Sequence, residues 1–139
     1  MYAYPLMLDV SQRLIVIVGG GAVAVRKAAG LLDAGATRIR VVAPEISNDL
    51  ARGIEHVKDN YRSDHLNGAS LVFAATDHAD VNAQVVRDAH ARNLLVGRAD
   101  AADGDLDALG DFATPAKFTQ GPVTVAVSAG GNPALAAAI

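Results

Sequence analysis

A glycine-rich turn near the N-terminus holds the residues whose type and spacing point most directly to chemistry. It follows a β-branched apolar run and leads into a helical pattern. Glycines remove the Cβ atoms that would keep a pyrophosphate from the backbone, and a helix N-terminus offers free N–H groups and a positive dipole end. The spacing Gly19-x-Gly21-x-x-Ala24 matches the dinucleotide fingerprint with its permitted alanine. A tight turn without a ligand is the alternative, but the flanking strand and helix favour dinucleotide binding. The residues expected around the dinucleotide here are Gly19, Gly20, Gly21, Ala22 and Val23.

Acidic residues beyond the second expected strand bear on the identity of the dinucleotide. That strand ends at Ala43, Pro44 prevents its continuation, and Glu45 lies two residues beyond it. A carboxylate there could hold the ribose hydroxyls of NAD, although a solvated loop acid would look the same. Since no basic pair is present to accept a 2′-phosphate, the sequence favours NAD over NADP.

Two further carboxylates follow expected strands. Thr76-Asp77 lies at the carboxyl end of one strand, where open α/β sheets bind ligands. Asp100 follows the next strand and Arg98, and could act as a general base or contact a metal. By spacing alone, the better interpretation of Asp100 is a loop acid, one of five aspartates in residues 100–111.

Other polar residues leave their roles open. Arg26 and Lys27, one turn into the first helix, could reach phosphate or substrate carboxylates, or form a solvated helix face. The alternating aspartates of residues 103–107 lack the glycine and glutamate of a calcium loop, so we expect no metal. The four histidines show no paired ligand spacing, and only His78 lies near the expected ligand edge.

The elements that must position these residues alternate between strand and helix. This order predicts an α/β, Rossmann-like, doubly wound and mostly parallel sheet with helices on both faces. The run LVFAA, residues 71–75, reads as a central strand buried on both faces, and Gly35 is a plausible left-handed cap. The expected strands are 14–18, 38–43, 54–57, 70–75, 94–97 and 122–127, and the expected helices are 22–34, 46–52, 64–67 and 79–91.

Composition sets the remaining bounds. The chain has 139 residues and a net charge of −3, which argues against nucleic acid as a partner. It has no cysteine, no signal peptide and no apolar run long enough to span a membrane, so we expect a soluble, cytoplasmic protein. We expect a nucleotide-binding domain over residues 1–131. Residues 132–139 would start a helix too short to stand alone, so either the chain is cut short or this helix packs on something else.

Taken in order, these motifs resemble the siroheme synthase N-terminal family, whose members are precorrin-2 dehydrogenases and sirohydrochlorin ferrochelatases. The resemblance covers nearly the whole chain. Its segments are residues 18–27, Val41-Val42-Ala43-Pro44, Ala74-Ala75-Thr76-Asp77 followed by Val81-Asn82, Phe112-x-x-Pro115, and Val125-Ala126-Val127-Ser128-x-Gly130-Gly131.

The resemblance implies NAD-dependent oxidation of precorrin-2 to sirohydrochlorin and, in some members, insertion of ferrous iron to give siroheme. It makes Asp100 the leading catalytic candidate, Ser128 a substrate-side residue, and Arg98 a partner for a substrate carboxylate. It also implies a homodimer in the full-length protein and makes 132–139 the start of a helical dimerisation segment. The residues it places around NAD are Gly19 to Val23, Pro44, Glu45, Thr76 and Asp77.

Two alternatives remain beside that implication. A non-catalytic module that only binds NAD(H) would carry the same glycine turn. A short-chain dehydrogenase would need a Tyr-x-x-x-Lys pair on a helix, and the sequence has none.

Overall fold

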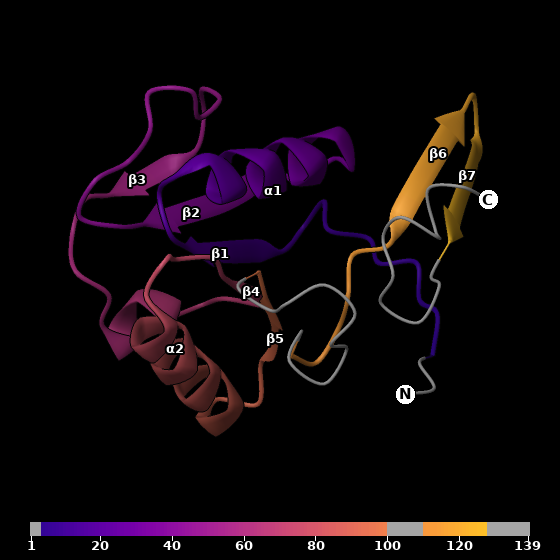
Figure 1. Cartoon of the computed structure of the whole chain (residues 1–139). Helices are drawn as coiled ribbons and strands as arrows, with labels where there is room; N and C mark the ends of the chain where they lie inside the picture. Colours follow the sequence, from indigo (N-terminus) through magenta and orange to yellow (C-terminus); the bar gives the residue numbers. More distant parts are fainter. Residues whose placement is uncertain (1–3, 100–109, 128–139) are drawn as a thin grey trace.

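The computed structural model of the chain describes residues 4–99 and 110–127. Strands and helices alternate through most of this part (Figure 1). The strands are β1 (Leu14–Val18), β2 (Arg38–Val42), β3 (Glu55–Val57), β4 (Leu71–Ala74), β5 (Leu95–Arg98), β6 (Ala116–Gln120) and β7 (Val123–Val127); the helices are α1 (Ala22–Asp33), α2 (Ala79–Ala91) and the 3-10 turn η1 (Ser63–Leu66).

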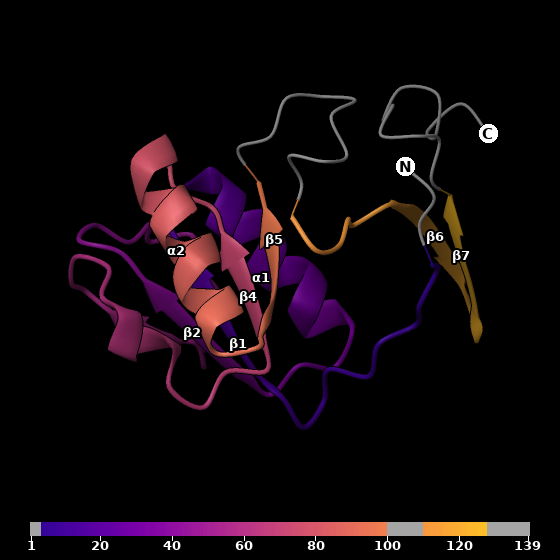
Figure 2. The ribbon, with the colours of Figure 1, turned by 90° about the horizontal axis from the view of Figure 1, so that it is seen from below.

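Five strands form one parallel sheet in the order β3-β2-β1-β4-β5. The helices α1 and α2 lie on opposite faces of this sheet (Figure 2). The chain leaves β1 toward β2 on one side and returns to β4 on the other, so the winding reverses at the end of β1. This arrangement confirms the predicted Rossmann-like fold, and its switch point is where open α/β sheets bind ligands.

The sheet buries both faces because its central strand is apolar at every position. Ile15 and Ile17 pack in the cluster that includes Ala24 and Ala28 of α1. Val16 packs in a second hydrophobic cluster, which includes Val85 of α2. Successive side chains of a strand point to opposite faces, so an uninterrupted β-branched run supplies both layers of the core. The strand β4 is likewise buried throughout, as predicted, although β1 takes the middle of the sheet.

The end of α1 confirms the predicted glycine cap. Gly35 has φ +90°, and its N–H donates to Leu32 O at 3.0 Å while the N–H of Ala36 donates to Leu31 O at 2.9 Å. These two bonds form a Schellman motif, which satisfies the last carbonyl groups of the helix.

The prediction of a helix over 46–52 is wrong. This segment turns instead, because the Ser47 side chain accepts the N–H of Asp49 at 3.1 Å and the Ser47 N–H donates to Gly20 O at 2.8 Å. Such local bonds compete with helix formation. The helix predicted over 64–67 is the single 3-10 turn η1.

The strand predicted over 122–127 is present as β7 but does not join the parallel sheet. It pairs antiparallel with β6, which the sequence analysis did not predict, in a separate hairpin (Figure 1). The hairpin exposes Phe118, Val123 and Val125. The segment expected to begin a helix at 132–139 lies outside the described residues. Within the described part, no helix is long and apolar enough to cross a membrane.

Candidate functional site

An open groove of ≈ 1300 Å³ runs along the carboxyl edge of the sheet across the switch point. The glycine turn after β1, the loop after β2 and the loop after β4 line most of it, and residues after β3 and on α2 complete the lining. His78 also lines it, as its predicted position required. All nine residues predicted around the dinucleotide lie on this one groove: Gly19, Gly20, Gly21, Ala22, Val23, Pro44, Glu45, Thr76 and Asp77.

The first two glycines are required by close backbone packing. Gly19 has φ +134°, and a Cβ there would lie 2.3 Å from the carbonyl oxygen of Ala75. A Cβ on Gly20 would lie 2.1 Å from the carbonyl oxygen of Glu45. The turn therefore fits between the ends of β4 and β2 only without side chains, which fixes the N-terminus of α1 at the switch point.

The third glycine faces open space. A Cβ built on Gly21 meets no heavy atom within 4 Å. Gly21 is also the N-cap of α1, and it provides no side-chain bond to the first helical N–H groups. Those N–H groups have no acceptor within the helix, and the dipole adds positive potential there. The turn thus leaves a cradle that fits the pyrophosphate of a dinucleotide and that a side chain would fill.

The loop after β4 is held by a residue whose role sequence reasoning missed. Asn82 on α2 is fully buried, its Oδ1 accepts the N–H of Thr76 at 3.1 Å, and its Nδ2 donates to Thr76 O at 2.9 Å. The Thr76 hydroxyl lies 2.8 Å from the same Oδ1 and accepts the N–H of His78 at 3.1 Å. In the sequence, the signal that could have pointed to this clamp is an asparagine six residues after Thr76, inside the expected helix 79–91.

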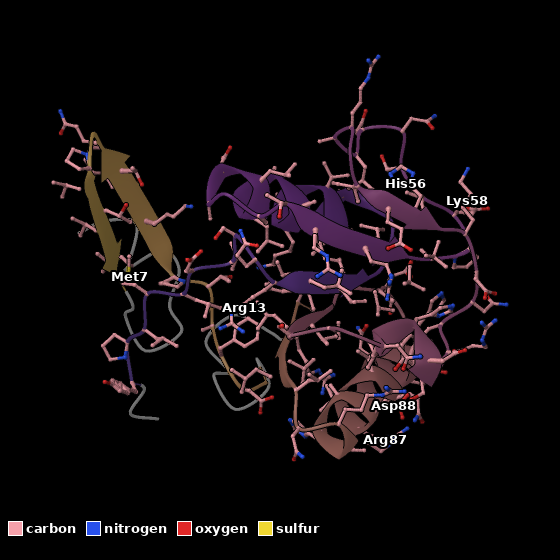
Figure 3. All side chains as sticks on the ribbon, turned by 180° about the vertical axis from the view of Figure 1, so that it is seen from behind. Met7, Arg13, His56, Lys58, Arg87 and Asp88 are labelled. Atoms are coloured by element: carbon pink, nitrogen blue, oxygen red, sulfur yellow. The ribbon has the colours of Figure 1, made fainter. Side chains whose placement is uncertain are left out.

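Glu45 and Tyr61 also line the groove. Tyr61 donates to Asp88 Oδ2 at 2.8 Å. Asp88 lies on α2 (Figure 3). Burial, and then Asp88, raise the pKa of the Tyr61 phenol. Arg40 is packed within the fold: it pairs with Glu55 at 2.9 Å and donates to the carbonyl oxygen of His65 at 3.0 Å. Glu45 is exposed on the groove.

A smaller pocket of ≈ 210 Å³ adjoins the groove, and Val23 lines both. Arg98, predicted to meet a substrate carboxylate, lies on this pocket. Asp100 is two residues further along the chain and falls outside the described residues, as does Ser128. Their predicted roles therefore stay predictions. The remaining lining residues are Arg26, Lys27, Phe73, Gly97, Ala99, Phe112, Ala113 and Thr114.

The chain on both sides of residues 100–109 is fixed to the same strand. Gly110 pairs antiparallel with Gly97, and the N–H of Asp111 donates to Val96 O at 2.8 Å. The Asp111 carboxylate accepts the N–H of Val96 at 2.9 Å and lies 2.9 Å from His90 Nε2. The segment that carries Asp100 therefore leaves and rejoins the sheet at the carboxyl end of β5, beside the pocket.

Metal ligands do not gather in the described residues: nowhere in 4–99 and 110–127 do three His, Asp or Glu side chains come together as a possible metal site. The aspartates of residues 103–107 lie outside this part.

Residues 6–116 match the model of a family described as "Putative NAD(P)-binding". The chain is 41% identical over 145 aligned residues to the siroheme synthase of Chromobacterium violaceum, covering 100% of this chain and 30% of that protein. It is 42% identical over 133 residues to the siroheme synthase of Pseudomonas aeruginosa, covering 92% and 27%. The chain thus spans less than a third of the length of these relatives.

The chain is also similar to proteins of known structure. The chain superposes on the precorrin-2 dehydrogenase SirC with a TM-score of 0.80 and 28% identity, over 98% of this chain and 67% of that one. A likeness to the tRNA N6-threonylcarbamoyladenosine dehydratase of E. coli, at TM-score 0.56 and 16% identity, shows the fold alone. The resemblance drawn from the sequence motifs is confirmed by these similarities.

Proposed function

The chain belongs to this NAD(P)-binding family, and from that premise we propose that it oxidises precorrin-2 to sirohydrochlorin with NAD. The observation that carries the proposal is the position of the two cavities. A pyrophosphate cradle lies at the switch point, and a cationic pocket adjoins it at Val23. The likeness to siroheme synthases and to SirC supports precorrin-2 as the substrate.

The glycine turn would hold the pyrophosphate against the first N–H groups of α1. Glu45 would take the ribose hydroxyls, and Thr76-Asp77 would line the middle of the cofactor, on a loop that Asn82 keeps rigid. When bound, NAD supplies the hydride acceptor. These chain residues bind and orient the cofactor; they do not take part in bond breaking.

The oxidation removes one hydride and one proton from precorrin-2, giving sirohydrochlorin, NADH and H⁺. Asp100 would accept the proton, since an ionised carboxylate can act as a general base. Arg98 would pair with a carboxylate of the substrate, and Ser128, the residue after β7 in the sequence, would also contact the substrate.

Three further features belong to the same proposal. Ferrous iron would be a substrate for insertion into sirohydrochlorin, with Asp100 taking pyrrole protons. The full-length protein would be a homodimer. It would work in the cytoplasm, which fits the absence of cysteine from its sequence.

Turnover of precorrin-2 by the full-length protein tests the proposal. The wild type should form sirohydrochlorin and NADH in equal amounts, and Asp100→Ala should lower kcat by about 100-fold or more, in the range of a lost general base. Asp49→Ala, which changes an exposed acid away from the pocket, is the matched control. Sirohydrochlorin formation that is no faster than without the protein, or that does not depend on NAD, would favour a non-catalytic nucleotide-binding module. Equal rates in the wild type and Asp100→Ala would refute the role of Asp100.

A further inference from the structure

Among the residues that the structure describes, the pocket beside the groove is lined by cations and by no acid. Its described lining includes Arg26, Lys27 and Arg98 and no Asp or Glu. Its position at the end of β5 puts it next to the residue that precedes Asp100. A concave site lined by one sign of charge concentrates ligands of the opposite sign.

Lys27 is the residue of this pocket whose surroundings are least expected of a surface lysine. It is half-buried, and its Nζ lies 5.6 Å from the centre of the Phe73 ring. Its ammonium donates to the Thr114 hydroxyl at 2.8 Å. Among the residues that the structure describes, it forms no ion pair with a carboxylate, so two of its three N–H donors are left for a ligand.

The position of Lys27 disfavours the charged form of its side chain. Burial, and then the neighbouring Arg26, lower the pKa of the Lys27 ammonium. A cation held in such a place gains most from an incoming anion, because hydrogen bonds between charged partners strengthen when water is displaced.

Two aromatic rings form the apolar wall of the same pocket. Phe73 and Phe112 meet edge to face with ring centres 5.3 Å apart. Phe112 packs directly on the strand, since a Cβ on Gly97 would lie 2.8 Å from its ring. The pocket therefore combines an apolar wall for methylene groups with an ammonium for a carboxylate.

The volume of the pocket indicates that it holds part of a ligand and not a whole one. At ≈ 210 Å³ the pocket is smaller than the cavities of about 300–1,000 Å³ that enclose complete small molecules. A carboxyalkyl arm of a larger molecule fits this combination of volume, wall and charge.

We propose that this pocket is a carboxylate subsite for one acidic arm of the tetrapyrrole, with Lys27 as the residue that binds the carboxylate. Phe73 and Phe112 take the methylene groups of the arm, and Thr114 holds the ammonium in place. Binding there orients the macrocycle at the edge where β5 ends. This subsite rests on the proposed function, because the tetrapyrrole is its ligand.

Titration of the full-length protein with sirohydrochlorin, followed by fluorescence without NAD, tests the subsite. Lys27→Met keeps the length of the side chain and removes its charge. We expect it to weaken sirohydrochlorin binding about tenfold, as for the loss of one charged hydrogen bond. Lys27→Arg should recover part of the affinity. Lys58→Met, an exposed lysine just beyond β3 (Figure 3), is the matched control and should change nothing.

The methyl ester of sirohydrochlorin tests the charge of the ligand. The wild type should bind the acid more tightly than the ester, and Lys27→Met should reduce that difference by the share of one carboxylate. NAD affinity, measured in parallel by calorimetry, should be the same in wild type and Lys27→Met, which also shows that the variant is folded.

The results separate the two proposals. If the wild type binds sirohydrochlorin and Lys27→Met binds it equally well, the subsite is refuted and the proposed function stands. If Lys27→Met loses NAD affinity as much as sirohydrochlorin affinity, Lys27 serves the dinucleotide and the subsite is refuted. If the wild type binds neither compound, both proposals fail.

Discussion

Replacing Gly20 and Gly21 one at a time by alanine should separate the packing role of the turn from its binding role. A Cβ on Gly20 would lie 2.1 Å from Glu45 O, 2.9 Å from Ala43 Cβ and 3.0 Å from Ile46 Cα. Two of these atoms are backbone and cannot swing aside. Overpacking of this kind costs about 1–3 kcal/mol. For a chain of this size, about 4 °C in Tm accompanies each kcal/mol, so Gly20→Ala should lower Tm by roughly 4–12 °C.

Gly21→Ala should behave differently. Its backbone has φ −95° and ψ −158°, which any residue adopts, and its Cβ meets nothing within 4 Å. Replacing glycine lowers the conformational entropy of the unfolded chain, which stabilises the fold, whereas alanine is a poorer N-cap than glycine. These two effects offset each other, so the free energy of unfolding should stay within about 1 kcal/mol of the wild type. The new methyl group would occupy the cradle, however, and a clash of about 1–3 kcal/mol with a pyrophosphate would weaken NAD binding roughly 5- to 150-fold.

Thermal denaturation and NAD calorimetry on both variants give the answer. The reasoning is refuted if Gly21→Ala binds NAD as tightly as the wild type, since the cradle would then not hold the pyrophosphate. It is also refuted if Gly20→Ala is as stable as the wild type, since the contact with the loop after β2 would then be wrong.

Two further predictions concern the residues that hold the groove in shape. Asn82→Ala should destabilise the chain by about 2–4 kcal/mol, because it removes a buried side chain and leaves the partly buried N–H and C=O groups of Thr76 without their partner. Arg87→Ala on the exposed face of α2 (Figure 3) should cost less than about 0.5 kcal/mol, and equal urea denaturation curves would contradict the clamp. The raised pKa of Tyr61 predicts that stability falls above about pH 10, because the unfolded chain then loses the phenol proton that the folded chain retains. Tyr61→Phe should flatten that fall between pH 9 and pH 11, by at most about 1 kcal/mol since the side chain is partly exposed, and an unchanged slope would show that other groups cause it.

The fold could be predicted from the sequence where one physical signal dominates. The β-branched run of β1 and the glycines after it leave no other local structure, and Gly35 ends α1 as its freedom at positive φ allows. The segment over 46–52 was misread because its apolar spacing suits a helix, while the bonds of Ser47 to Gly20 and Asp49 exist only in the folded chain. The strand β6 is not predicted because its five residues are exposed and only Ala116 and Phe118 among them are apolar, an alternation too short to indicate a strand.

Only one part of the candidate site could likewise be predicted from the sequence. The groove could be predicted because each segment follows a strand, and parallel strands bring their carboxyl ends to one edge. The pocket could not, because Lys27, Phe73 and Thr114 come from distant parts of the chain and meet only through the path of the chain after β5. From the sequence alone, Lys27 could as well have been a solvated residue.

An NMR titration of the ¹⁵N-labelled chain with NAD shows which amide groups the dinucleotide contacts. We expect the amide signals of Gly20, Gly21 and Thr76 to shift most and the signals of the β6–β7 hairpin to stay unchanged, and we expect NADP to cause the same shifts only at higher concentration. Saturating NAD that leaves the glycine turn unshifted, or that shifts the hairpin instead, would contradict this expectation.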